Sequence, residues 1–311
     1  MQGLNAALGR PTDDPGSRAK VILDLAFGPR QSKARSLTEA SLRIFEDLGD
    51  RRHGGWALHN LGRIALRERK FDDARAPLEA SLAAFRAAGD AAGVGTSLGD
   101  PGIAWLLDGD LDRASACFEE SLALLRGQGD HWSLGYTLYS VADLHARRGE
   151  NDRVRALLEE ALAHFRRVRN HWGTALVDID LALLDHREGD DRRARSRLME
   201  AVVAGRYHGV DPRVWEVLLA LGVVAIGEGA FAAGLRLLGA AVARVTLADP
   251  RPTDRAELEE SLATARSALG EEAFATAWAE GQAMTLEQAV VYALEDGGRS
   301  AAPSASLESH S

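Results

Sequence analysis

The sequence predicts an all-α fold: a right-handed α-solenoid of about six helix-turn-helix repeats, each about forty residues long, with a C-terminal helical cap. The main observation is that similar segments return at a fixed period: EASLRIFEDLGD from Glu39, EASLAAFRAAGD from Glu79 and EESLALLRGQGD from Glu119. A fixed period of this length is typical of stacked repeats, because each unit buries its apolar faces only against a neighbouring copy. The second observation is that no segment reads convincingly as a strand, whereas helical spacing recurs throughout.

The period continues beyond these three segments. Small residues keep one register through five successive units, and large apolar residues accompany them. The two sets of small positions are Ser41, Ser81, Ser121, Ala161 and Ala201, and Gly62, Gly102, Ala142, Ala182 and Gly222. Small side chains let helices approach closely, while the large ones fill the layers that stacking buries.

Within one unit the apolar spacing is helical. Residues at steps of three and four form one face: Phe71, Ala74, Leu78, Ser81, Leu82 and Phe85. We expect Gly89 to end this helix, because glycine tolerates a positive φ, and Asp90 to cap the next helix with its carboxylate. Each unit therefore reads as helix A, a tight turn, helix B and another tight turn.

The register divides the chain into four parts. Residues 1–13 read as the remnant of a preceding repeat helix, and residues 14–249 as the repeat array. Residues 250–296 read as a helical cap, and residues 297–311, rich in Gly, Ser and Ala, as a disordered tail.

The cap has its own helix signals. We expect a first helix with Thr253 or Asp254 as its N-cap, because both side chains can accept from free backbone N–H groups. Two further helices should follow, broken near Gly281, the second opened by a capping box of Thr285 and Gln288.

Pro101 is the one discord in the repeats, since it stands where Leu61 and Leu181 stand inside helix A. Proline removes a backbone hydrogen bond and costs about 3 kcal/mol inside a helix unless relieved, so we expect a kinked or shortened helix. Two interpretations stay open: tolerated drift of the repeat, or a hinge in the superhelix.

A family resemblance rests on the repeated positions. The pattern of Leu58, Leu61–Gly62, Ala74, Leu78 and Ser81 resembles the tetratricopeptide repeat, and the resemblance covers roughly residues 14–245. The departure is length, because about two extra residues in each helix give a period of about forty rather than about 34. The resemblance implies an array of paired helices.

A second resemblance lies at the carboxyl end. The segment AWAEGQAMTLEQAV, from Ala277 to Val290, looks like the end of repeat arrays in large bacterial regulators of the signal-transducing NTPase type, including LuxR-type activators. Those regulators also have an NTP-binding domain, and this sequence has no Gly-x-x-x-x-Gly-Lys-Ser/Thr loop. The resemblance therefore covers only their sensor array, and we expect a fragment or a descendant of a larger regulator.

Composition excludes several classes of function. The net charge is −9 and no basic run occurs, which argues against direct binding of nucleic acid. Cys117 is the only cysteine, so the chain has no internal disulfide and no cysteine-based zinc site. No signal peptide and no membrane-spanning apolar run are found, so we expect a cytoplasmic protein without membrane contact.

Acidic residues between Leu107 and Glu120 come near the spacing of a calcium loop: Asp108, Asp110, Asp112 and Glu119. Arg113 replaces the glycine that the sharp turn of such a loop needs. The same positions form a turn and a helix start in the repeat register, and we interpret them so. We therefore predict no metal site here.

Histidine and cysteine give no firmer chemistry. His131–Trp132 and His171–Trp172 recur at the repeat period, and we expect them to pack or cap at a turn, with a paired ligand site as the alternative. Cys117 lies between apolar neighbours and reads as a small buried side chain. No nucleophile pairs with a base, so we predict no catalytic residues, no cofactor and no enzymatic activity.

The tetratricopeptide resemblance implies a site as well as a fold. In that family the A helices line a concave groove that binds an extended peptide. The predicted groove residues are Trp56, His59, Arg63 and Arg67; Tyr136, Tyr139, Asp143 and Arg147; and Ile179, Leu183, His186 and Arg187; with Thr96, Ile103, Leu107, Glu216, Leu219 and Val223 at matching positions. Their charge leans positive, so the expected partner is a protein or peptide with acidic groups.

Three functions stay open. The first is a binding module, the sensor or scaffold part of a transcriptional or signalling regulator. The second is a structural spacer or a homo-oligomerisation array without its own ligand. The third is an enzyme with a site between helix layers. We expect the first, because aromatic and arginine residues on one face are typical of binding surfaces.

Overall fold

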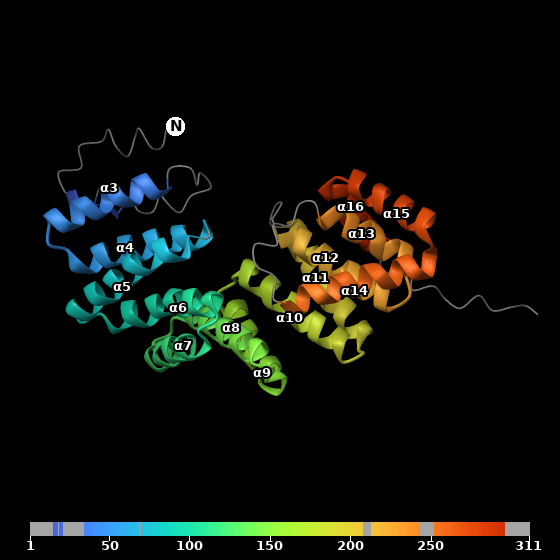
Figure 1. The fold of residues 1–311 in the computed structure, drawn as a ribbon. Helices are drawn as coiled ribbons and strands as arrows, with labels where there is room; N and C mark the ends of the chain where they lie inside the picture. Colours follow the sequence, from blue (N-terminus) through green and yellow to red (C-terminus); the bar gives the residue numbers. More distant parts are fainter. Residues whose placement is uncertain are drawn as a thin grey trace, which may run out of the picture. The chain divides into compact units, whose positions relative to one another are not determined.

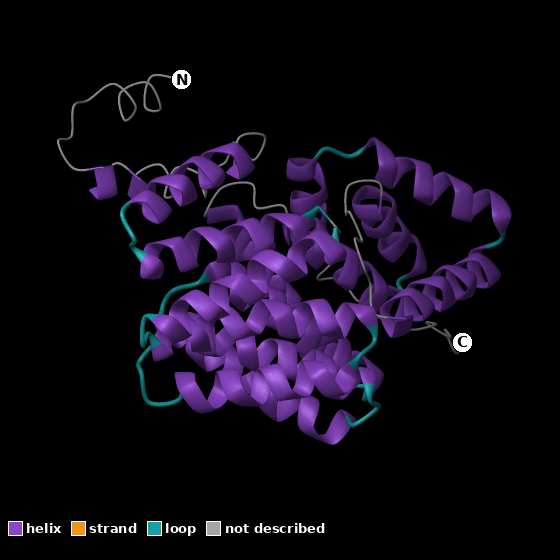
Figure 2. Ribbon diagram, turned by 60° about the vertical axis from the view of Figure 1, so that its left-hand side comes forward, coloured by secondary structure: helices purple, strands orange, loops and turns teal. Residues whose placement is uncertain are grey.

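The predicted all-α class is confirmed. A computed structural model of the protein describes residues 15–17, 19–20, 34–68, 70–207, 213–242 and 252–295, and within these ranges the regular structure is helical (Figures 1 and 2). The chain forms two compact units, which join in the sequence between Leu157 and Leu158. The predicted helix remnant at 1–13 and the predicted tail at 297–311 lie outside the described residues.

The first unit is a run of helix pairs. Its helices are α3 (Ala34–Asp47), α4 (Arg51–Arg67), α5 (Phe71–Ala87), α6 (Ala91–Asp108), α7 (Leu111–Leu125) and α8 (His131–Arg147), and α9 (Asn151–Arg167) begins in this unit and ends in the next. From α3 to α8 each helix contacts its successor, and α6 also contacts α4 and α8 (Figure 1). The A helices α4, α6 and α8 therefore form one layer, as the period predicts.

Turns and caps follow the predicted chemistry. Gly89 has a φ of 66° between α5 and α6, a left-handed conformation that glycine adopts without strain. The Asp90 carboxylate then accepts from the backbone N of Gly93 at 3.0 Å. The same cap recurs at Asp50, Asp130 and Asn170. These contacts confirm that the closing Asp or Asn of each unit starts the following helix.

Small residues hold the helices of a pair together. The Ser81 hydroxyl donates to the carbonyl of Gly55 at 2.9 Å, and one repeat later the Ser121 hydroxyl donates to that of Gly95 at 2.7 Å. A Cβ added to Gly102 would collide with the ring of Phe118. The recurring serines and glycines are therefore positions of close helix contact, where a larger side chain has no room.

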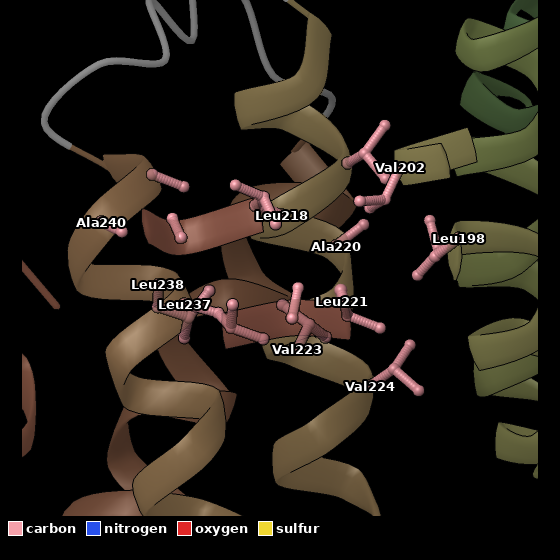
Figure 3. Packing of buried hydrophobic residues seen from close by; sticks show 14 of the residues in the cluster. Leu198, Val202, Leu218, Ala220, Leu221, Val223, Val224, Leu237, Leu238 and Ala240 are labelled. Atoms are coloured by element: carbon pink, nitrogen blue, oxygen red, sulfur yellow. The ribbon is translucent and has the colours of Figure 1, made fainter. Parts of the chain in front are cut away.

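The second unit contains the rest of α9 and seven further helices. These are α10 (His171–Arg187), α11 (Asp191–Tyr207), α12 (Arg213–Gly227), α13 (Phe231–Val242), α14 (Pro252–Leu269), α15 (Glu271–Ala283) and α16 (Leu286–Glu295). A continuous apolar core joins them, with Leu198 and Val202 of α11 beside Leu221 and Val224 of α12 (Figure 3). The last helices close this core, because α15 packs on α13 and α14 contacts both α12 and α13 (Figure 1).

One predicted cap is wrong and one is confirmed. Thr253 and Asp254 lie inside α14, which already includes Pro252, and proline is well accepted in a first helical turn. The capping box forms as predicted: Thr285 N donates to Gln288 Oε1 at 2.8 Å, and Gln288 N donates to Thr285 Oγ1 at 3.2 Å. The break expected near Gly281 follows Ala283.

Pro101 does not shorten its helix, so that part of the prediction is wrong. Helix α6 runs through Pro101 for 18 residues, against 17 in α4 and in α8. The proline is buried, and only one backbone hydrogen bond is lost at its nitrogen. Whether Pro101 acts as a hinge stays a prediction.

No helix in the described ranges is long and apolar enough to cross a membrane.

Candidate functional site

The predicted groove residues fall into two groups, because the chain forms two units. Those on α4 and α8 belong to the first unit, and those on α10 belong to the second. Each group is therefore a separate candidate site.

On α4, Trp56 and His59 form the floor of the first group. The His59 ring is 4% exposed and meets the edge of Trp56, with ring centroids 5.5 Å apart. Trp56 also meets Phe85 edge-on, at 5.0 Å between centroids. These two predicted groove residues are thus largely packed between helices. They lie beneath the surface and offer little of their side chains to a ligand.

A carboxylate that the sequence reasoning missed joins α4 to α6. Asp100 Oδ2 lies 3.3 Å from His59 Nε2 and 3.7 Å from Arg63 Nε. Burial lowers the pKa of His59, although the nearby Asp100 charge acts in the opposite direction. The predicted groove positions of this helix were Thr96, Ile103 and Leu107, and Asp100 was not among them.

Arg63 reaches from α4 over α6 to α8. Its guanidinium carbon lies 5.9 Å from the centre of the Trp132 ring, and Trp132 in turn packs on Tyr136 at 4.6 Å. Both α4 and α8 contact α6, so the contact between Arg63 and Trp132 spans α6. Gly99 of α6 contributes no side chain there, and a Cβ on it would meet only Thr137 Oγ1, at 4.0 Å.

Trp132 is the second residue that the sequence reasoning missed. We expected it only to pack or cap at a turn; it does pack on Tyr136, but it is also 41% exposed. Its spacing was the available signal, because Trp132 precedes Tyr136 by one helical turn and so shares its face.

Arg67 gives this face its surplus of positive charge. It is exposed and makes no ion pair with a residue in the described ranges. Partial burial of its guanidinium and the adjacent charge of Arg63 lower the pKa of Arg67, while Asp100 raises it. Arginine stays charged near neutral pH, so Arg63 and Arg67 bring two positive charges against the one negative charge of Asp100. We call Arg63, Arg67, Asp100, Trp132 and Tyr136 the basic face.

The remaining predicted residues of α8 add no net charge. Arg147 Nε donates to the Asp143 carboxylate at 3.2 Å, a pair one helical turn apart. Tyr139 is half-buried on the same helix. A ligand on the basic face would therefore meet the aromatic side of α8 more than its charges.

On α10 the predicted residues divide between core and surface. Ile179 and Leu183, which the prediction placed on an exposed face, are 9% and 8% exposed and belong to the apolar core of the second unit. Helix α10 is apolar on more than one side, so the period could not tell its exposed face from its packed one. His186 and Arg187, at its end, line a cleft with α14.

The calcium-like acids act as a turn and as ion-pair partners. Asp110 caps α7 by accepting from the backbone N of Arg113 at 3.1 Å. Asp108 pairs with Arg75, and Asp112 pairs with Arg148 at 2.9 Å. In the described part of the chain no three His, Cys, Asp or Glu side chains are grouped to hold a metal ion.

Cys117 is half-buried on α7. Burial raises the pKa of its thiol, and Glu120 raises it further, so the protonated and less nucleophilic form is favoured.

Comparison with known proteins identifies no family for this chain: no family model matches its sequence, and no curated protein matches it either.

Proposed function

We propose that the basic face binds an extended protein segment that carries carboxylates, and that the chain is a non-enzymatic binding module. One arrangement carries the proposal: Arg63 crosses α6 to the exposed Trp132, beside Arg67, which has no ion pair with a described residue. Arginine and tryptophan are enriched at binding hot spots, and a guanidinium pairs well with a carboxylate.

The charge balance supports an acidic ligand. The whole chain carries −9, so a distant acidic segment is repelled overall. The positive charges of Arg63 and Arg67 exceed the negative charge of Asp100, so an acidic segment is attracted only at the basic face. An extended segment suits a surface built across three helices, since it can follow the face from α4 to α8 while its apolar groups lie on Trp132 and Tyr136.

The wider role is part of the same proposal. Helix pairs that recur at the repeat period, with recurring caps and recurring serine contacts, support a tetratricopeptide-like, right-handed array. The resemblance of the cap to the ends of regulator arrays supports a sensor or scaffold of a bacterial transcriptional or signalling regulator, acting in the cytoplasm. We propose no contact with nucleic acid or membrane, and self-association as a spacer is the competing function.

A buried acid with a raised pKa could favour an enzyme instead. Asp178 of α10 is such an acid, with a pKa of about 6 caused by burial. Asp178 does not line the cleft beside α14, and its charged neighbours are Arg166, Arg197 and Glu200. The residue is only 6% exposed and lies among these charged side chains, so its environment supports packing more than catalysis.

Affinity capture from source-cell lysate, read by mass spectrometry, tests the proposal. The full chain is compared with Arg67→Glu/Trp132→Ala and with Arg43→Glu, an exposed charge reversal on α3, after circular dichroism shows that all three are folded. We expect a protein partner that the double variant loses and Arg43→Glu retains. A partner held equally by all three would contradict the proposal, and self-association without any partner would favour the spacer.

A further inference from the structure

The second unit contains a cleft that the basic face does not involve. It has a volume of about 580 Å³ and lies between the end of α10, the turn from α12 to α13, and one side of α14. Clefts that hold small molecules commonly have volumes of about 300–1,000 Å³. The size of this cleft therefore suits a small organic ligand better than a chain segment.

Helix α14 is fixed as one wall of the cleft. Leu258, Leu262 and Ala265 pack into the apolar core. The row Ala256, Glu260 and Thr264, spaced by one helical turn, faces the cleft instead. The wall is tied to α10 by Arg187, whose Nη2 donates to Glu257 Oε2 at 2.7 Å.

The floor of the cleft is apolar. Ile226, at the end of α12, is 3% exposed, and Phe231, at the start of α13, is half-buried. A Cβ on Gly227 would collide with the His186 ring, so glycine lets that ring lie close against the end of α12. The cleft is thus shaped by the sequence at this turn and has room over Ile226 and Phe231.

Among the described residues, the charges around the cleft leave the Glu260 carboxylate without an ion-pair partner. Arg187 forms an ion pair with Glu257, and His186 Nδ1 hydrogen-bonds with Asp191. Glu260 lines the cleft and pairs with no residue in the described ranges. Arg187 and Gly227 are the last residues of α10 and α12, so the partly negative carbonyl ends of both helices add to the negative field.

We propose that this cleft binds a small organic monocation that carries an apolar group. The ammonium of the ligand lies at Glu260, near the carbonyl end of α12, and its apolar body lies on Ile226 and Phe231. A cation can pair with the exposed Glu260 carboxylate, whereas a neutral ligand cannot and an anion would be repelled by it. Size, apolar floor and one unpaired carboxylate together select this class.

Methyl NMR of the full chain tests the proposal, with the δ1-methyl of Ile226 as the local reporter. The probes are 2-phenylethylamine, the neutral 2-phenylethanol and the anion phenylacetate. We expect the amine to shift the Ile226 signal saturably, with the alcohol and the anion binding at least about fivefold more weakly, as one exposed ion pair allows. Equal binding of all three probes, or no binding of the amine, would overturn the proposal.

Matched variants locate the charge. Glu260→Gln should weaken binding of the amine by about fivefold, whereas Glu259→Gln, an exposed neighbour that does not line the cleft, should leave it unchanged. Ala256→Trp, on the exposed side of α14, should fill the cleft and abolish the Ile226 shift. Equal effects of the two glutamine variants, or binding that survives Ala256→Trp, would also overturn the proposal.

Discussion

Asp178 shows at the scale of one residue how burial competes with ion pairing. Its Oδ1 lies 3.8 Å from Arg166 Nη2 and 3.9 Å from Arg197 Nη1, distances too long for hydrogen bonds. Arg197 instead donates to the buried Asp185 at 2.9 Å. Burial therefore outweighs the attraction of the two arginines, and the pKa of Asp178 rises to about 6.

This raised pKa makes stability depend on pH in a definite direction. The folded value of about 6 exceeds the unfolded value of 3.8, so stabilisation by the protonated acid is complete below the unfolded value and is lost as the pH rises through 6. Asp178→Asn removes this loss. We expect the variant to gain roughly 2 kcal/mol of unfolding free energy relative to the wild type between about pH 4.5 and pH 7.5.

Urea denaturation at both pH values measures the difference. Asp152→Asn, an exposed acid on α9, is the control and should change nothing. If the difference in unfolding free energy between Asp178→Asn and wild type stays constant with pH, the pKa of Asp178 is not raised by folding and this account of Asp178 is wrong.

At the scale of helices, two glycines of α6 have distinct surroundings that one substitution each can separate. On α6, a Cβ at residue 102 would collide with Phe118, whereas one at residue 99 would meet only Thr137 Oγ1 at 4.0 Å. Gly102→Ala should therefore destabilise the chain by about 1–3 kcal/mol through overpacking. Gly99→Ala should be neutral or stabilise it by up to about 1 kcal/mol, because alanine favours helix.

Thermal and urea unfolding of these two variants provide the comparison. They share one helix and one chemical change, so helix propensity cancels between them. Similar stabilities for the two would mean that α6 and α7 are not as closely packed at Gly102 as described.

Helix positions followed from the sequence because local chemistry sets them. The turn at Gly89 and the caps at Asp90 and Thr285 depend on residues only a few positions apart, which a single sequence shows. The burial of Ile179 and Leu183 could not be predicted in the same way. Helix α10 is apolar around much of its surface, and which side is packed depends on its contact with α12, a helix further along the sequence.

At the scale of the whole molecule, the repeat period did not show that the chain forms two compact units. The same period runs through both, since Gly102 meets Phe118 in the first and Gly222 meets Leu238 in the second. A sequence repeat records neighbouring contacts only, so a division between units leaves it unchanged.

Only part of the candidate site could be predicted, because a repeat period does not show which side chains of different helices meet. Arg63, Arg67 and Tyr136 were assigned by register, and in the structure both Arg63 and Tyr136 contact the ring of Trp132. Asp100 was not in the predicted set, and Trp132 was expected only to pack or cap at a turn. The role of both depends on side chains that cross from one helix to the next. Contacts between side chains of different helices cannot be read from spacing along a single helix.

Fluorescence anisotropy can show whether the basic face binds acidic segments. A labelled peptide rich in Asp and Glu, and the same peptide with Asn and Gln, are titrated with wild type, Arg67→Glu and Arg43→Glu. We predict that wild type and Arg43→Glu bind the acidic peptide alike, that Arg67→Glu binds it at least about tenfold more weakly, and that none binds the amide peptide. Equal weakening by Arg67→Glu and Arg43→Glu, or equal binding of both peptides, would contradict the claim.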